Sequence, residues 1–175
     1  LPPQAEYFDH GFDLAYDPNT YWNTRDAFAV GGNFDGLDNA LEDATRFVEH
    51  AASERARGTV RQDDVLFMRY IDNQDEDRFL LRAGGDLRKA KSVAGFLLTV
   101  PGTPLVTYGN EVGIEELRGR YPFADYDDDS DRFGDPARNS LREHYRKLIT
   151  VRKGNRALHE ADLVREGSFL VSFIW

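Results

Sequence analysis

Residues 65–78, VLFMRYIDNQDEDR, join a short apolar run to a dense cluster of charged and amide side chains. The run Val65–Ile71 is rich in strand-forming residues and has charged flanks, a pattern typical of a strand buried on both faces of a parallel sheet. Ligands of barrels and open α/β sheets bind at the carboxyl ends of such strands. The cluster at 72–78 is therefore a candidate site for a polar ligand. The alternative is that its acids only cap the next element and pair with Arg78 and Arg82.

Three elements are predicted before this strand. Phe8–Tyr16 alternates loosely between apolar and polar residues and ends at a turn signal, which indicates a strand. A short helix is expected at about Tyr21–Val30, with glycines after it. From Leu37, apolar residues recur at spacings of three and four, which predicts an amphipathic helix ending near Gly58. The residues of its apolar stripe are Leu37, Leu41, Ala44, Phe47, Val48 and Ala51.

Helix and strand patterns also alternate after the central strand. This alternation is that of a parallel α/β fold, in which crossover helices cover the sheet. A closing pair of strands over 162–175 breaks it. The elements expected in between are a helix over 87–100 with Asp86 as N-cap, a strand over 104–108, a polar loop to about 136, and a helix over 141–153 with Ser140 and Glu143 as capping box.

Charge and composition exclude several classes of function. The 175 residues carry a formal charge of −9, so phosphate backbones and anionic membranes are repelled and neither nucleic acid nor a membrane is an expected partner. The chain has no cysteine, which excludes disulfides and thiolate chemistry. No stretch approaches the roughly 20 apolar residues needed to span a bilayer. We expect a soluble protein, cytoplasmic or secreted.

No metal or cofactor site is predicted. The acidic loop 125–131 lacks the glycine and glutamate that an EF-hand loop requires, and the sequence contains neither a phosphate-binding loop nor a Gly-x-Ser-x-Gly motif. Glycoside hydrolysis, by contrast, requires a pair of carboxylates. Asp75, with Arg78 nearby in sequence, could supply one. No residue clearly supplies the second, because Glu111 lies in a loop where a structural role fits at least as well.

Two ordered motifs stand at the ends of the predicted strands. Residues 70–79 read YIDNQDEDRF, and residues 101–104 and 108–113 read PGTP and YGNEVG. They resemble the α-amylase family, glycoside hydrolase family 13, whose seventh barrel strand ends in F-x-x-N-H-D-x-x-R-F. The eighth strand of that family begins with Pro-Gly-x-Pro and ends in Tyr-Gly-x-Glu-x-Gly. Softer similarities link residues 8–21 to its sixth strand and residues 144–158 to its eighth helix.

The resemblance implies a partial (β/α)8 TIM barrel. Residues 1–158 would hold strands six to eight with their helices, and residues 159–175 would begin a C-terminal β-domain. By the same likeness Asp75 is the catalytic carboxylate that bonds sugar hydroxyls most strongly in the transition state. The residues that would bind substrate are Gln74, Arg78 and Asn73. Gln74 replaces the usual histidine of the family, and its amide donates and accepts hydrogen bonds but does not titrate.

The implied function is that of part of a retaining α-amylase-type glycosidase or glucanotransferase acting on α-glucosidic bonds. The nucleophilic Asp and the acid/base Glu of the family follow strands four and five, and no segment here matches either motif, so we expect the chain to be inactive alone. Its expected partners are an α-glucan or oligosaccharide and a second copy or the remainder of a longer parent chain. The alternatives are a non-catalytic carbohydrate-binding or interaction protein derived from the family, and an unrelated doubly wound binding domain.

Overall fold

Three parallel strands form the larger sheet in the described part of the chain. The computed structural model describes residues 7–8, 12, 14–32, 34–56, 66–116, 126–127, 132–133 and 135–158. The strands lie in the order β1 (Leu14–Tyr16), β2 (Leu66–Arg69), β3 (Thr103–Pro104). Leu14 pairs with Leu66, and Met68 pairs with Thr103. Because all three strands run the same way, their carboxyl ends meet at one edge of the sheet.

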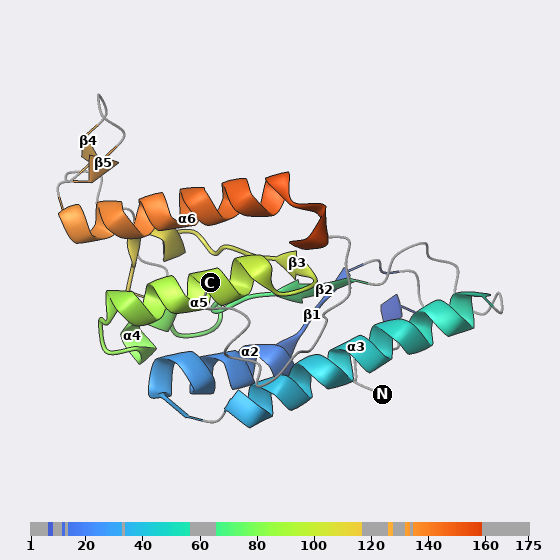
Figure 1. Ribbon diagram of the computed structural model, residues 1–175. Coiled ribbons are helices and arrows are strands. Elements are labelled where there is room, and N and C mark those ends of the chain that lie inside the picture. The colour runs from blue at the N-terminus through green and yellow to red at the C-terminus, as the bar shows by residue number, and fades with distance from the viewer. Residues whose placement is uncertain are drawn as a thin grey trace.

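Helices follow each strand and pack around the sheet. In the view of Figure 1, α6 lies at the top and α3 at the bottom, with α5 and the strands between them. The helical elements are α2 (Pro18–Arg25), the π-helical turn η1 (Asp26–Val30), α3 (Phe34–Ala56), α4 (Phe79–Arg82), α5 (Leu87–Thr99), the short η2 (Asn110–Val112), α6 (Pro136–Gly154) and η4 (Arg156–Leu158).

The helix predicted at Tyr21–Val30 is confirmed, with an earlier start. Asp17 caps α2 by accepting a hydrogen bond from the Thr20 backbone N–H at 3.0 Å, and Pro18 occupies the first turn, where its missing donor costs nothing. The helix continues through η1 and stops at Gly31, whose φ of 79° is the left-handed value that glycine accepts without strain.

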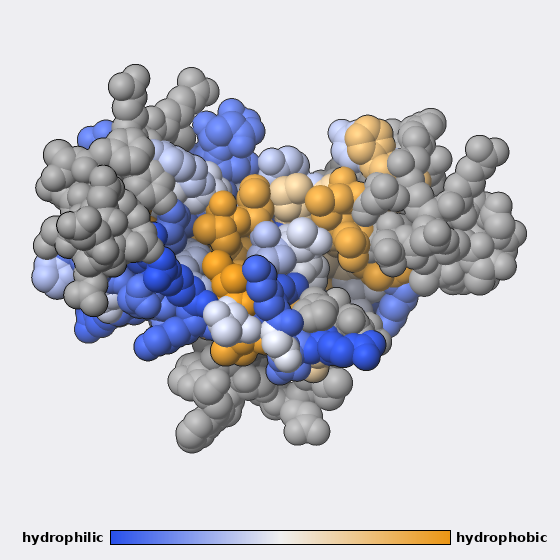
Figure 2. All heavy atoms as spheres, turned by 90° about the horizontal axis from the view of Figure 1, so that it is seen from above, coloured by the Kyte–Doolittle hydropathy of each residue, from blue (hydrophilic) through white to orange (hydrophobic). Residues whose placement is uncertain are grey.

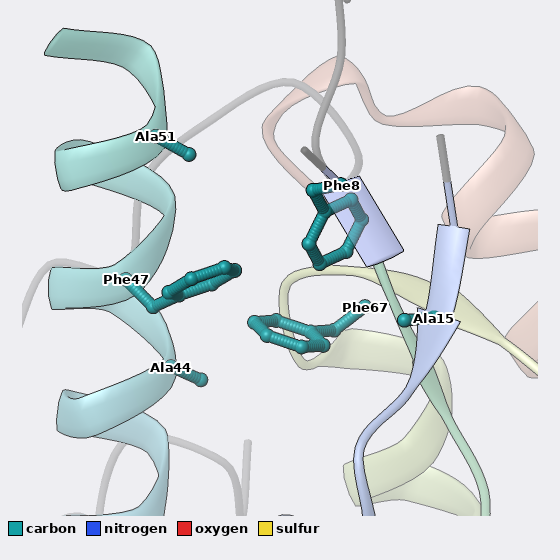
Figure 3. Close-up of a cluster of buried hydrophobic side chains, with 6 residues drawn as sticks. All are labelled: Phe8, Ala15, Ala44, Phe47, Ala51 and Phe67. Carbon is teal, nitrogen blue, oxygen red and sulfur yellow. The ribbon is translucent and has the colours of Figure 1, made fainter. Parts of the chain in front are cut away.

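A cluster of aromatic and small side chains joins α3 to β1 and β2. The predicted stripe of α3 is buried at Leu37, Leu41, Ala44, Phe47 and Ala51, whereas Val48 is 37% exposed and lies outside it. Figure 3 shows Phe47 of α3 pointing toward Phe67 of β2 and Phe8. Their ring centroids lie 5.4–5.9 Å apart. Burial of these rings fixes α3 against the sheet, away from its carboxyl edge.

Two predicted strands are shorter than expected. The strand expected over Phe8–Tyr16 begins only at Leu14, because Phe8 belongs to a helical turn and fills the core against α3. The strand expected over 104–108 is paired only at Thr103–Pro104, with one further bond from Leu105 N to Arg69 O at 2.7 Å. Proline lacks a donor for the ladder, and the residues beyond it bond to the turn after β2 instead.

The central strand, expected over Val65–Ile71, is paired at Leu66–Arg69. Phe67 and Arg69 are 4% and 6% exposed, but Leu66 is 42% exposed, so burial on both faces fails at the start of the strand. Val65 lies outside the described residues.

The capping box predicted at Ser140 and Glu143 is wrong. Helix α6 begins at Pro136, where Asp135 accepts a hydrogen bond from Ala137 N at 2.8 Å. An Asp-Pro pair is the stronger start signal, since it provides both the cap and a pre-set first turn. Ser140 lies inside the helix, and its hydroxyl accepts a bond from Lys91 Nζ at 2.6 Å, which joins α6 to α5.

The polar loop expected up to about residue 136 contains regular structure. Residues after β3 form η2, and a short antiparallel ladder pairs β4 (Tyr126–Asp127) with β5 (Arg132–Phe133). The closing hairpin predicted over 162–175 lies outside the described residues, as do most of residues 125–131. No helix in the described part of the chain is long and apolar enough to cross a membrane.

Candidate functional site at the carboxyl edge of the sheet

The turns that follow β2 and β3 lie side by side. The Thr107 hydroxyl donates to the Asp72 carbonyl oxygen at 2.6 Å, and Arg78 Nη2 donates to the Tyr108 carbonyl oxygen at 2.8 Å. The acidic turn and the turn after Tyr108 therefore share one edge of the sheet. Two segments about 35 residues apart in sequence form one surface.

Asp72 is the centre of this arrangement. Its side chain is 0% exposed, and its Oδ2 accepts hydrogen bonds from Phe79 N at 2.9 Å and Asn110 Nδ2 at 2.8 Å. Its Oδ1 lies 3.6 Å from Arg78 Nη1. The carboxylate thus caps α4, holds η2 and balances a buried cation. A role for these acids in capping the next element is correct for Asp72.

The exposed apex of the turn carries Gln74 and Asp75. The Asn73 side-chain oxygen accepts hydrogen bonds from the backbone N–H groups of Asp75 at 2.9 Å and Glu76 at 3.1 Å, which closes the turn. Gln74 Nε2 donates to Asp75 Oδ2 at 2.9 Å. Both side chains are exposed. The Asp75 carboxylate is therefore bonded to Gln74 and exposed to solvent.

Arg78 does not lie against Asp75, although the two are close in sequence. Its side chain is 4% exposed and bonds the carbonyl oxygens of Tyr108 and Ile114, the second at 3.3 Å. Burial decides this pairing, because a guanidinium inside the protein needs acceptors there and Asp75 faces solvent. Arg82 forms an ion pair with Asp77 at the surface, as the structural alternative expected.

Glu111, the weak candidate for a second carboxylate, is engaged in its own turn. Its Oε2 accepts a hydrogen bond from Gly109 N at 3.1 Å, and burial raises the pKa of its carboxyl group. Gly109 has a φ of 88°, and a Cβ there would lie 2.4 Å from Ile114 Cδ1. The tight turn after β3 explains why this motif contains glycine and glutamate at these positions.

A buried ion pair between β1 and β2 was not predicted from the sequence. Arg69 bonds Asp17, donates to Thr20 Oγ1 at 2.8 Å and donates through Nε to the Pro101 carbonyl oxygen at 2.9 Å. Burial lowers the pKa of the Arg69 guanidinium. The pair connects the ends of β1 and β2 to the start of β3. An arginine inside the run VLFMRYI was the only sequence signal.

A row of four aromatic rings, the aromatic row, borders the acidic turn and was also not predicted. It consists of Tyr16, Tyr70, Tyr21 and Trp22. Tyr70 stacks on Tyr21 with centroids 4.7 Å apart, Tyr16 meets Tyr70 edge-on at 5.2 Å, and Trp22 lies 4.8 Å from Tyr21. The Tyr21 hydroxyl donates to Glu76 Oε2 at 3.2 Å, and burial raises the pKa of Tyr21 to about 12.

Acidic residues are frequent here, yet they are separated. Across the described residues, no group of three or more metal-binding side chains gathers as a metal site requires. The acids at this edge have separate partners instead: Glu76 bonds Tyr21, Asp77 pairs with Arg82, and the exposed Asp75 bonds Gln74.

Solved structures share this fold. An α-amylase from H. orenii superimposes with a TM-score of 0.68 at 22% identity, covering 94% of this chain and 36% of that one. A cyclic α-maltosyl-(1→6)-maltose hydrolase from Arthrobacter globiformis, solved in complex with maltose, gives a TM-score of 0.64 at 20% identity, over 88% and 32% of the two chains. The chain therefore has the α/β fold of the barrel of these amylases.

Curated relatives give the family. The chain is 32% identical over 157 residues to α-amylase MalA of Haloarcula japonica, and 30% identical over 168 residues to a cyclomaltodextrinase of Geobacillus thermopakistaniensis. These alignments cover 88% and 85% of this chain but only 20% and 28% of the relatives. No family model matches the chain. With its fold and its relatives, the chain belongs to the α-amylase family of glycoside hydrolases.

Proposed function

We propose that the chain forms part of a retaining α-glucan-active enzyme and that the turn carrying Asp75 binds the glucan. Residues 1–158 would supply strands six to eight of the barrel, and residues 159–175 would begin the C-terminal β-domain. The observation that carries the proposal is an exposed carboxylate on a turn fixed by Asn73, at the carboxyl edge of a parallel sheet. Relatives named α-amylase and cyclomaltodextrinase support a glucan as the ligand.

Each residue of the turn has a distinct part in this proposal. Asp75 accepts hydrogen bonds from sugar hydroxyls, and Gln74 orients its carboxylate through the 2.9 Å bond to Oδ2. Asn73 fixes the turn. Arg78 is buried and acts indirectly, because it holds the neighbouring turn by donating a hydrogen bond to the Tyr108 carbonyl oxygen. We assign Gln74, Asn73 and Arg78 to substrate binding. Gln74 and Asn73 lie on the turn near the sugar, and Arg78 supports the neighbouring turn.

A retaining glycosidase needs a nucleophile and an acid/base residue about 5 Å apart. In this family Asp75 would be neither the nucleophile nor the acid/base residue. The Glu111 carboxylate accepts a hydrogen bond from Gly109 N within its own turn. We propose that the chain alone binds an α-glucan without cleaving it. The alternative of an unrelated doubly wound domain is wrong, since the chain belongs to the α-amylase family. A non-catalytic carbohydrate-binding protein of the same family is the second candidate, and the amide of Gln74 in place of a titratable histidine favours it.

Titration calorimetry with maltoheptaose tests the glucan site. We expect Asp75→Asn to weaken binding about tenfold or more, because a charge-assisted bond to a hydroxyl is lost. The free energy of unfolding should change by no more than about 0.5 kcal/mol, since the side chain is exposed. The wild-type chain should release no sugar from a chromogenic maltoside.

Asp77→Asn is the matched control, because Asp77 lies two residues away and pairs with Arg82 at the surface. It should leave the affinity within about twofold of wild type. Equal affinity of wild type and Asp75→Asn contradicts the site, and clear turnover of the maltoside contradicts the proposed inactivity.

We further propose that the open sides of the sheet are covered by a second copy or by other parts of a parent chain. Among the described residues, β1 and β3 pair only with β2, so each presents an edge. Leu66 is 42% exposed and Val30 is 70% exposed. Figure 2 shows apolar residues gathered in a band across the face in view, with hydrophilic residues beside it.

Light scattering after size-exclusion chromatography tests this covering. The isolated chain is expected to elute as a dimer or larger, and the mass should rise with concentration, because unpaired strand edges and apolar surface favour association. A monodisperse monomer at every concentration contradicts the prediction.

A further inference from the structure

The aromatic row has two buried members and two that face solvent. Tyr21 and Tyr70 are 1% and 7% exposed, whereas Tyr16 and Trp22 are 41% and 43% exposed. The buried pair accounts for packing between α2 and the end of β2. Within the described residues, packing does not account for the outer rings, and Trp22 in particular leaves a large apolar face exposed on α2 at a free-energy cost.

Trp22 is fixed in position although it is exposed. The Arg25 guanidinium carbon lies 4.2 Å from the centroid of the Trp22 ring, and the ring also meets Tyr21. A cation over one face holds the side chain on the surface of α2. A half-exposed indole that already makes these contacts is partly pre-organised for a ligand, since part of the ordering cost precedes binding.

The row is continuous with the turn that carries Asp75. Trp22 contacts Tyr21, the Tyr21 hydroxyl bonds Glu76, and Glu76 is the next residue after Asp75. Glu76 is also tied to the turn through its backbone N–H, which donates to Asn73 Oδ1. Tyr21 and Glu76 therefore link the exposed indole to the turn that carries Asp75.

We propose that Trp22 forms a second sugar-stacking surface, which binds a glucose unit of the glucan beyond the one at Asp75. This inference rests on the proposed function and adds the direction in which the glucan lies. A pyranose ring has an apolar face that packs on an aromatic ring and hydroxyls at its rim. Beside the rings, Glu76 provides an acceptor for those hydroxyls, and the net charge of −9 favours such a neutral ligand over an anionic one.

Affinity as a function of glucan length tests the second surface. Maltose and maltoheptaose are titrated into the wild-type chain, Trp22→Ala and Trp22→Phe. We expect Trp22→Ala to weaken maltoheptaose binding about fivefold to tenfold, the worth of one aromatic contact, and to leave maltose binding within about twofold. Trp22→Phe should restore most of the loss, because a ring remains.

The control is Phe12→Ala, since Phe12 is 57% exposed and lies before the amino end of β1, the opposite end from Tyr16. It should leave both affinities unchanged. Circular dichroism confirms that each variant is folded. If Trp22→Ala leaves maltoheptaose binding intact, or weakens both sugars equally, the second surface is refuted while the Asp75 site stands. If the wild type binds neither sugar, the proposed function itself is refuted.

Discussion

Replacing Asp72 with alanine is expected to lower the free energy of unfolding by about 3–5 kcal/mol, because the change leaves a buried cation without its counter-charge. Arg78 is 4% exposed and would keep only backbone carbonyls as partners. Two donors, Phe79 N and Asn110 Nδ2, would also lose the oxygen that they share. The measurement is urea denaturation followed by circular dichroism.

A second variant separates the charge effect from simple loss of packing. In the Asp72→Ala background, Arg78→Met removes the orphaned cation, so the double variant should be less destabilised than the sum of the single variants. Asp77→Ala is the surface control and should cost less than about 1 kcal/mol, since its ion pair with Arg82 is exposed. A cost below about 1 kcal/mol for Asp72→Ala would show that the carboxylate is not the structural centre of the edge.

The parts of the fold that sequence predicted are those governed by local rules. The periodic spacing from Leu37 to Ala51 requires one buried face, and α3 follows it. Asp86 accepts a bond from Arg88 N as a helix cap does. The meeting of the two turns was also predictable, because parallel strands necessarily end at the same edge.

The missed features depend on which segments become neighbours in space. Asp75 and Arg78 are three residues apart, but the arginine turns inward to Asp72 and the aspartate outward. The aromatic row requires the register that sets Tyr16 opposite Met68, which brings the ends of β1 and β2 together. That register cannot be predicted from the spacing or the composition of the sequence. The exposed turn and the pairing of its acids with Arg78 and Arg82 were both offered by the sequence, whereas the aromatic row beside the turn was not.

Gly102→Ala is expected to destabilise the protein by about 2–5 kcal/mol, the combined cost of a strained backbone and an overpacked contact. Gly102 has a φ of 111°, which side-chain-bearing residues rarely adopt, and a Cβ there would lie 2.7 Å from the Phe67 carbonyl oxygen. That oxygen belongs to β2 and cannot move without shifting the strand. The Gly102 carbonyl also accepts a bond from Arg152 Nη2 at 2.6 Å, so the loop is held on a second side.

Gly95→Ala provides the matched control for this glycine. Gly95 lies within α5, and a Cβ there would have no neighbouring atom within 4 Å outside its own helical turn, so alanine should be neutral or stabilise by up to about 1 kcal/mol. Thermal or urea unfolding of the two variants compares them directly. If Gly102→Ala is as stable as Gly95→Ala, the close approach of the Pro-Gly-x-Pro segment to β2 is wrong. The large cost expected at Gly102 gives a physical reason for the glycine of the Pro-Gly-x-Pro motif. Without a side chain at this position, the chain enters β3 close to β2, and this close approach brings the two carboxyl-edge turns together.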